Sequence, residues 1–205
     1  MPNFKPLLVS CSLVLGTVAF TMGYTQTATA NTEKSAIFAG GCFWCMEEAF
    51  EKIDGVSEVV SGYSNGHDPE PDYRSVSAGS TGHAEVVEVK YDPATVSYAQ
   101  LVDIFWKNID PTVENQQFCD KGSQYRSGIY YLNDEQKEVA IKSLQDLKSS
   151  GRFETIYTEI EPAGKFFMAE AYHQDYYKKN PFRYRYYKLS CGRTDRLEEV
   201  WGSNG

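Results

Sequence analysis

Hydrophobic and polar residues follow two periods along this chain, and these periods divide it into strands and helices. Alternating apolar and polar positions are typical of a half-buried strand, as in residues 84–91, which read A-E-V-V-E-V-K-Y. Apolar residues three or four positions apart behind a capping residue are typical of a helix, as in 97–108. We predict strands at 35–38, 56–63, 84–91, 124–132 and 155–161, and helices at 46–53, 97–108, 133–150 and 165–179.

These elements follow one another without strict alternation of strand and helix. That order favours an α+β fold over a doubly wound parallel sheet. We expect a two-layer mixed sheet with packed helices, in the form of a ferredoxin-like plait with extensive loops. The longest loop, 64–80, is rich in Gly, Pro, Asp and Ser, and long loops in compact domains are often functional.

Residues 1–30 have the composition of a secretory signal peptide. Lys5 is the only charged side chain before Glu33, residues 6–20 are mostly apolar, and Ala28-Thr29-Ala30 supplies the small residues that precede a cleavage point. The apolar core of about 15 residues is shorter than the roughly 20 that span a bilayer. We therefore expect an exported protein, periplasmic or secreted, with a single domain at 31–205. A leader retained as a membrane anchor is the alternative.

Charge argues against a protein that binds nucleic acid. Without Lys5, the mature chain has 19 basic and 28 acidic residues, a net charge of −9. Affinity for phosphates requires a basic face, and we expect the basic cluster at 178–188 to be a solvated surface.

Candidate chemistry concentrates in residues 39–48, which read A-G-G-C-F-W-C-M-E-E. An apolar strand leads into the Gly-Gly turn and a helix follows it, so Cys42 is expected at or just before the first helical turn. Free backbone N–H groups and the helix dipole stabilise a thiolate there, so we expect a lowered pKa for Cys42. The thiolate is the nucleophilic form of cysteine.

Three interpretations of Cys42 and Cys45 compete at this point. A zinc half-site needs a second cysteine pair at matching spacing, and Cys119 and Cys191 are too far apart in sequence to supply one. A thioredoxin-type redox pair is compatible with C-x-x-C at a helix start. The third is a nucleophilic cysteine with a nearby resolving thiol, in which case the aromatic residues at 43 and 44 could hold an apolar group such as a methyl.

Five segments in order resemble the A-type peptide methionine sulfoxide reductases. They are 41–44 (GCFW), 62–63 with the loop to Tyr73-Arg74, 81–87 (TGHAEVV), 122–127 (GSQYRS) and 171–176 (AYHQDY). Together they span nearly the whole mature chain. Five segments in one order are far more specific than any one of them.

The resemblance implies an enzyme that reduces methionine S-sulfoxide, free or in proteins, and so repairs proteins after oxidation; each sulfoxide epimer needs its own enzyme. It makes Cys42 the nucleophile, with Phe43 and Trp44 holding the methyl group of the substrate. A thiolate that attacks the sulfoxide sulfur needs an acid near the oxygen.

The family's acid maps onto Glu85, which burial would keep protonated. Tyr73 and Tyr125 map onto hydrogen-bond donors to the sulfoxide oxygen, and Asp120 onto a polar residue that shapes the site. The sequence alone favours the interpretation that Glu85 lies on the solvent face of a half-buried strand, like Glu88. The resemblance reverses that preference.

The reaction would leave a sulfenic acid on Cys42, which condenses with a second thiol to a disulfide. Many members of the family carry glycine at the position of Cys45 and resolve through cysteines in a Gly-rich tail. This tail instead reads Leu189-Ser190-Cys191-Gly192-Arg193. We slightly favour Cys191, on a tail that could move, as the resolving thiol, with Cys45 as relay or substitute. Cys119 adjoins Asp120 and could lie near the site, but we expect a buried bystander.

The sequence contains no phosphate loop, dinucleotide fingerprint or metal constellation. We therefore expect no bound cofactor or metal, with electrons supplied by an external thioredoxin-like or dithiol reductant. We also expect a monomer. For His83 and His173 we expect structural hydrogen bonds. A thiol–disulfide oxidoreductase using Cys42 and Cys45 is the second candidate function, and a non-catalytic secreted binding module is the third.

Overall fold

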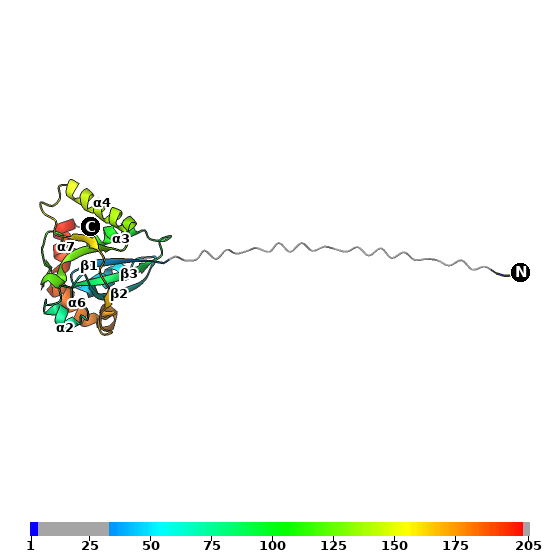
Figure 1. The fold of residues 1–205 in the computed structure, drawn as a ribbon, viewed down its shortest axis with the longest axis horizontal. Coiled ribbons are helices and arrows are strands. Elements are labelled where there is room, and N and C mark those ends of the chain that lie inside the picture. The colour runs from blue at the N-terminus through cyan, green and yellow to red at the C-terminus, as the bar shows by residue number, and fades with distance from the viewer. Residues whose placement is uncertain (4–32, 203–205) are drawn as a thin grey trace. The chain divides into compact units, whose positions relative to one another are not determined.

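The computed structural model describes residues 1–3 and 33–202 of the chain. The leader predicted at residues 1–30 lies, apart from its first three residues, outside the described residues. From Lys34 to Trp201 the chain folds into strands and helices around one main sheet (Figure 1).

The main sheet has six strands in the order β7-β6-β1-β3-β2-β8. Neighbouring strands are antiparallel except β6 and β7, which are parallel, so the sheet is mixed as predicted. The strands are β1 (Lys34–Gly40), β2 (Val56–Ser64), β3 (Ala84–Tyr91), β6 (Ser127–Tyr131), β7 (Glu159–Pro162) and β8 (Phe167–Met168). A separate ribbon pairs β4 (Gln116–Gln117) with β5 (Asp120–Lys121).

The succession β1-α1-β2-β3-α3-β6 forms the predicted ferredoxin-like plait. Its strands lie in the order β6-β1-β3-β2, each antiparallel to its neighbours, which confirms the α+β class. Helix α4 packs against α3 (Figure 1). The helices are α1 (Phe43–Glu51), α2 (Tyr73–Ser77), α3 (Tyr98–Lys107), α4 (Asp134–Ser149), α5 (Tyr176–Lys179), α6 (Pro181–Ser190) and α7 (Arg193–Trp201), with a 3-10 turn η1 (Ser123–Tyr125).

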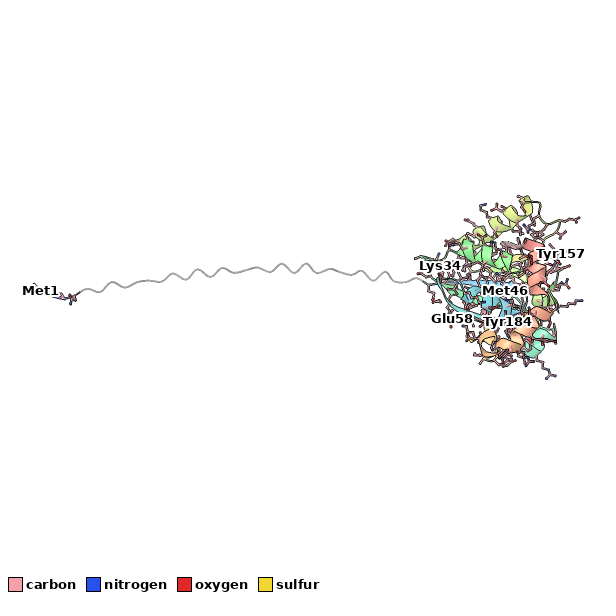
Figure 2. The ribbon with its side chains drawn as sticks, turned by 180° about the vertical axis from the view of Figure 1, so that it is seen from behind. Met1, Lys34, Met46, Glu58, Tyr157 and Tyr184 are labelled. Atoms are coloured by element: carbon pink, nitrogen blue, oxygen red, sulfur yellow. A yellow bond between two sulfur atoms is a disulfide. The ribbon has the colours of Figure 1, made fainter. Side chains whose placement is uncertain are left out.

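Two hydrophobic clusters lie on opposite faces of the sheet. Alternate residues of β1 divide between them: Ala36 and Phe38 belong to the large cluster, and Ile37 and Ala39 to the small one. The large cluster also holds Met46 of α1, which is fully buried in the middle of the fold (Figure 2). Helices α1 and α3 therefore cover the face that contains the main core, and α1 carries Cys42 at its start.

Residues 165–179 do not form the predicted helix. Two of these residues form β8, which pairs with the edge of β2, and only the last four are helical, as α5. The Gln174 amide bonds the backbone of Ser61 twice, accepting from its N–H and donating to its carbonyl, each at 2.9 Å. Pairing with an open sheet edge has overridden the helical spacing of the aromatic residues.

Other boundaries also differ from the prediction. Loop 64–80 contains α2, the strand expected at 124–132 begins at Ser127 after η1, and the strand expected at 155–161 is Glu159–Pro162. The tail beyond residue 180 is helical, with Tyr184, Arg193 and Val200 buried. Among the described residues, no helix combines the length and the apolar composition needed to cross a membrane.

Candidate active site

Cys42 is positioned by the turn between β1 and α1. Gly41 has a φ of +79°, and a Cβ added there would lie 2.5 Å from the Cβ of Gln117, so the turn requires glycine. Cys42 is the N-cap residue of α1, and its carbonyl accepts hydrogen bonds from the N–H groups of Cys45 (3.1 Å) and Met46 (3.4 Å). Cys42 therefore lies at the helix start, as expected, but is only 5% exposed.

Glu85 approaches the same point from β3. It alternates with Val87, Val89 and Tyr91, which belong to the main core, so it lies on the helix-covered face of the sheet. Its carboxyl accepts a hydrogen bond from the Phe43 N–H at 3.1 Å, and the residue is 2% exposed. Burial raises the pKa of Glu85 to about 8, so the carboxyl is protonated at neutral pH.

A small cavity of about 80 Å³ brings the predicted site residues together. Since a water molecule occupies about 30 Å³ in the liquid, the cavity accommodates the end of one side chain. Its lining is Cys42, Phe43, Trp44, Tyr73, Glu85, Asp120, Tyr125 and Tyr187. The sequence singled out all of these except Tyr187.

Tyr73 and Tyr125 reach the cavity from two short helical segments. Tyr73 begins α2, and its backbone N–H donates to the Glu170 carboxylate at 2.8 Å. The hydroxyl of the buried Tyr63 donates to the same carboxylate at 2.8 Å, which ties α2 to β2. Burial raises the pKa of Tyr73 to about 12 and also raises that of Tyr125. Both hydroxyls therefore keep their protons and can donate hydrogen bonds.

The two aromatic residues after Cys42 are held by contacts with the segment 171–176. The Trp44 ring stacks on Tyr176 with centroids 3.8 Å apart, and its indole N–H donates to Nδ1 of His173 at 3.1 Å. Phe43 contacts the rings of Tyr63 and His173. These contacts fix both ring planes at the cavity wall, and they make His173 a structural hydrogen-bond acceptor, as expected.

His83 also has a structural place. Its Nδ1 accepts from the Gly66 N–H at 3.0 Å, and its Nε2 lies 2.8 Å from the Asp68 carbonyl oxygen. The imidazole thus joins the loop after β2 to the start of β3. This agrees with the structural role expected for it.

Cys42 and Cys45 are free thiols that hydrogen-bond to each other at the start of α1. Burial raises the pKa of Cys42 well above its ordinary value. The hydrogen bond from Cys42, aided by the charge of Arg193, lowers the pKa of Cys45 to about 6. The lowered pKa expected for Cys42 is therefore wrong. The pair keeps its negative charge on Cys45, and the Phe43 N–H at the helix start is taken by Glu85.

Cys119 and Cys191 form a disulfide across a sequence separation of 72, with Cα atoms 4.9 Å apart. Cys119 is exposed rather than buried, and it is bonded rather than a bystander. Cys191 caps the end of α6 instead of lying on a loose tail. The disulfide therefore joins the residue before Asp120 to the helix that carries Tyr187.

Two clusters of described residues bring three potential metal ligands within 4.8 Å of one another. One consists of Cys119, Asp120 and Cys191, whose two sulfurs are bonded to each other. The other consists of Glu47, Glu51 and Asp175, where the Lys178 ammonium lies 2.7 Å from Glu51 and 2.9 Å from Asp175. In that cluster a lysine already occupies the place of a cation.

The site combines a buried thiol, a protonated carboxyl and several tyrosine hydroxyls around one small cavity, with a second, more acidic thiol beside the first. A thiol with a proton donor at hand can attack an electrophilic atom and protonate the group that departs, and the second thiol can then form a disulfide. Fold and site thus define a thiol-dependent oxidoreductase of the α+β class.

Comparison with known proteins gives the family. Residues 34–205 match the family model for peptide methionine sulfoxide reductase. The chain is 49% identical over 167 residues to the peptide methionine sulfoxide reductase MsrA of Streptococcus uberis, covering 81% of this chain and 98% of that one. The chain belongs to the peptide methionine sulfoxide reductase family, whose reaction is the thiol-dependent reduction of methionine sulfoxide.

A longer relative and solved structures agree with this assignment. Peptide methionine sulfoxide reductase MsrA/MsrB of Vibrio cholerae is 44% identical over 198 residues, covering 96% of this chain and 52% of that one, so the chain spans about half the length of that relative. Reduced Mxr1 from Saccharomyces cerevisiae has a TM-score of 0.68 at 36% identity, covering 73% of this chain and 87% of that one. Mxr1 in complex with Trx2 has a TM-score of 0.50 at 27% identity, covering 70% and 84%.

The sequence assigned no role to three residues that build the site. Glu170 anchors α2, Tyr176 supports the Trp44 ring, and Tyr187 lines the cavity itself. The signal available for Tyr187 was its spacing of three from Tyr184, which places both on one face of a helix. That signal could be used only once the tail was known to be helical.

Proposed function

We propose that the protein reduces methionine S-sulfoxide, in oxidised proteins or as the free amino acid, with Cys42 as nucleophile and Glu85 as acid. One observation carries the proposal: the Cys42 thiol and the protonated Glu85 carboxyl line the same cavity of about 80 Å³. A methyl sulfoxide group fits a space of that size, whereas a folded protein disulfide does not.

In the proposed reaction, the Cys42 thiol first passes its proton to the hydrogen-bonded Cys45 thiolate. The Cys42 thiolate then attacks the sulfoxide sulfur while Glu85 protonates the sulfoxide oxygen, and Cys45 ionises again before the next step. Tyr73 and Tyr125 donate hydrogen bonds to that oxygen and orient it. The oxygen passes to Cys42 as a sulfenic acid, and methionine leaves. The substrate sulfur gains two electrons and the Cys42 sulfur loses two, so the step needs no other oxidant or reductant.

The methyl group of the substrate would lie against Phe43 and Trp44. The stacking of Trp44 on Tyr176 and its bond to His173 support this role, because they hold an apolar surface rigid beside the reacting sulfur. Asp120, which also lines the cavity, would shape another part of its wall.

Cys45 is the resolving thiol that the geometry favours over Cys191. It hydrogen-bonds Cys42 and its pKa is lowered to about 6, so it is a thiolate at neutral pH. Its attack on the sulfenic sulfur, with one proton, gives the Cys42–Cys45 disulfide and water. Cys191 is bonded to Cys119 and would first have to be released by reduction.

Mass mapping after one equivalent of sulfoxide tests this choice. Starting from the enzyme with Cys119–Cys191 intact, we expect a new Cys42–Cys45 disulfide and an unchanged Cys119–Cys191 bond. A Cys42–Cys191 disulfide would show that Cys191 resolves instead.

A thioredoxin-like protein is the proposed electron donor. The solved complex of the structural relative Mxr1 with Trx2 supports this partner for the fold. The reductant's thiolate would attack the Cys42–Cys45 disulfide and leave both cysteines reduced after a second exchange. Reduction by a thioredoxin system at micromolar concentration, with no added dithiothreitol, is the expected result.

Replacement of Cys42 tests the activity itself. Cys42→Ser should abolish reduction of methionine S-sulfoxide, and the native enzyme should leave the R epimer unchanged. A matched assay with insulin separates the competing function, since a thiol–disulfide oxidoreductase would reduce insulin and ignore sulfoxide epimers. Turnover of methionine sulfoxide by the Cys42→Ser variant would contradict the proposal.

Export of the protein is also a proposal. It is supported by the short charged start, apolar core and Ala28-Thr29-Ala30 site of the first thirty residues. N-terminal sequencing of the protein from its native cell should begin near Asn31. A chain that begins at Met1 and sediments with membranes would favour the retained anchor.

A further inference from the structure

Tyr187 lines the Cys42 cavity but has no role in the reaction described above. It comes from α6, and its ring meets Trp44 edge-on with centroids 5.9 Å apart. Its hydroxyl donates a hydrogen bond to the Asp120 carboxylate and is also within hydrogen-bonding reach of Cys42. A tyrosine hydroxyl has one hydrogen, so it can donate to only one of these two acceptors at a time.

We propose that Tyr187 is a further catalytic residue: its hydroxyl turns from the Asp120 carboxylate to the Cys42 sulfur when the Cys42 thiolate forms. The inference rests on the proposed role of Cys42 as nucleophile. Asp120 is then the competing acceptor, which holds the hydroxyl beside the sulfur and withholds its hydrogen until the thiol ionises.

A donor of this kind is needed because Cys42 is buried. Burial disfavours a thiolate, and a hydrogen bond to the charged form offsets that cost. The Phe43 N–H, a donor at the helix start, already bonds Glu85. Of the neighbours that influence Cys42, Tyr187 is the one that favours the thiolate.

Other ionisable groups face these three residues from the surrounding elements. They are Cys45 on α1, Tyr73 on α2, Glu85 on β3, Tyr125 on η1 and Arg193 on α7. Tyr184 and Lys188 on α6 act on Cys45. Burial keeps Glu85 and the tyrosines neutral at neutral pH. The Cys45 thiolate opposes a second thiolate at Cys42, and the Arg193 charge acts on Cys45 and Asp120 instead.

The disulfide holds Tyr187 and Asp120 in register. Cys119 directly precedes Asp120, and Cys191 lies one helical turn beyond Tyr187, where its N–H donates to the Tyr187 carbonyl at 3.0 Å. A covalent link between these positions keeps the Tyr187 hydroxyl within reach of Asp120. Small rotations of one side chain are then enough to exchange the acceptor.

The test measures alkylation of Cys42 by iodoacetamide between pH 5 and 9, with the modified cysteine identified by peptide fragmentation. The variants are Tyr187→Phe, Asp120→Asn and their combination. Tyr186→Phe is the matched control, because Tyr186 precedes Tyr187 on α6 and is 75% exposed. The reaction uses no sulfoxide, so its outcome is separate from the fate of the proposed reductase activity.

We expect Tyr187→Phe to slow alkylation of Cys42 at pH 7 about tenfold, the equivalent of one unit in the pKa of the thiol. Asp120→Asn should speed it, because the hydroxyl is released to the sulfur. In the combined variant that gain should vanish, whereas a plain charge effect of Asp120 would persist without Tyr187. Tyr186→Phe should match the native enzyme.

Three results would overturn the inference: an unchanged pH profile in Tyr187→Phe, slower alkylation in Asp120→Asn, or a gain from Asp120→Asn that survives in the combined variant. Melting temperatures are recorded for every variant. If Tyr187→Phe does not fold, Asp120→Asn decides alone, since slower alkylation there contradicts competition for the hydroxyl and faster alkylation supports it.

Discussion

The two cysteine pairs of this protein are in opposite chemical states. Cys42 and Cys45 are buried and free, one helical turn apart, beside a protonated acid. Cys119 and Cys191 lie at a more open place and are joined to each other across a sequence separation of 72. The cysteine side chain is the same in all four residues, so the difference comes from what surrounds each sulfur.

Each pair does what the other cannot. The buried pair holds one negative charge, and the neighbouring groups stabilise it on Cys45. Cys42 is the member of the pair that lines the cavity together with Glu85. The second pair ties the loop before Asp120 to the C-terminal helices and so fixes one wall of the cavity. Reactivity in one pair thus depends on the structural role of the other.

The largest expected effect concerns the acid beside the buried pair. Glu85→Gln should lower kcat/KM for methionine S-sulfoxide by a factor of about 10²–10⁴, because a positioned general acid typically contributes that much. The native rate should fall as the pH rises through about 8, where Glu85 loses its proton. The variant should lack that fall.

The control for Glu85→Gln is Glu88→Gln. Glu88 lies on the same strand but with the opposite parity, half-buried and away from the cavity. Steady-state kinetics from pH 6 to 9 should give native values for this control. A similar loss in both variants would mean that the strand, not the acid, is responsible.

Removal of the second pair should affect stability. The combined variant Cys119→Ser and Cys191→Ser should lower the free energy of unfolding by about 2–4 kcal/mol, because the crosslink restricts the unfolded chain. Urea unfolding measures this difference. Added reductant should destabilise the native protein by the same amount and leave the variant unchanged; a reductant effect of equal size in the variant would place the stabilisation elsewhere.

Removing the proposed resolving cysteine gives a smaller effect on turnover. With a thioredoxin system as donor, Cys45→Ser should release one methionine per enzyme rapidly and then turn over at least about tenfold more slowly, because no thiolate remains next to the sulfenic acid. Single-turnover and steady-state rates of methionine release separate the two phases. Cys191→Ser should keep the steady-state rate; the reverse pattern would assign resolution to Cys191.

The smallest expected effect concerns a buried acid outside the cavity, and it tests whether burial raises the pKa of that acid as it raises the pKa of Glu85. Glu47 is 1% exposed, one carboxylate oxygen has no partner, and burial raises its pKa to about 7. An acid with a raised pKa stabilises the fold below its unfolded pKa of 4.5 and loses that contribution as the pH rises through 7.

Glu47→Gln should therefore reduce the pH-dependent loss of stability between pH 5 and 8 by an amount on the order of 1 kcal/mol. Urea unfolding at the two pH values measures it. Glu138→Gln, at an exposed position of α4, is the control and should preserve the native pH dependence. Equal curves for Glu47→Gln and the native protein would contradict the effect of burial.

Several elements of the fold could be predicted because local periodicity and burial agree in them. The strand at 84–91 and the helix at 97–108 lie where the sequence puts them, and the order of elements led to the plait. In the strand, the alternation also predicts which face of the sheet carries Glu85. Glu85 shares parity with the core residues Val87, Val89 and Tyr91, whereas Glu88 does not. A solvent-facing place for Glu85, like that of Glu88, is therefore inconsistent with the parity of the strand.

Elements that depend on distant partners could not be predicted in the same way. Residues 165–179 have helical spacing, but they meet the open edge of β2, and backbone pairing there outweighs intrinsic preference. The pKa of Cys42 was misjudged for a similar reason. The helix start is local, whereas the burial of the thiol and the acceptor for the Phe43 N–H come from other parts of the chain.

The sequence by itself determined the turn that presents Cys42, the aromatic residues beside it and the family to which the chain belongs, since these follow from residue types at short spacing. Only the tertiary structure decided which cysteines pair, which of the two buried thiols keeps the charge and that Tyr187 enters the cavity. Those outcomes depend on distances and burial between segments far apart along the chain. The local pattern of residues in the sequence does not determine such distances.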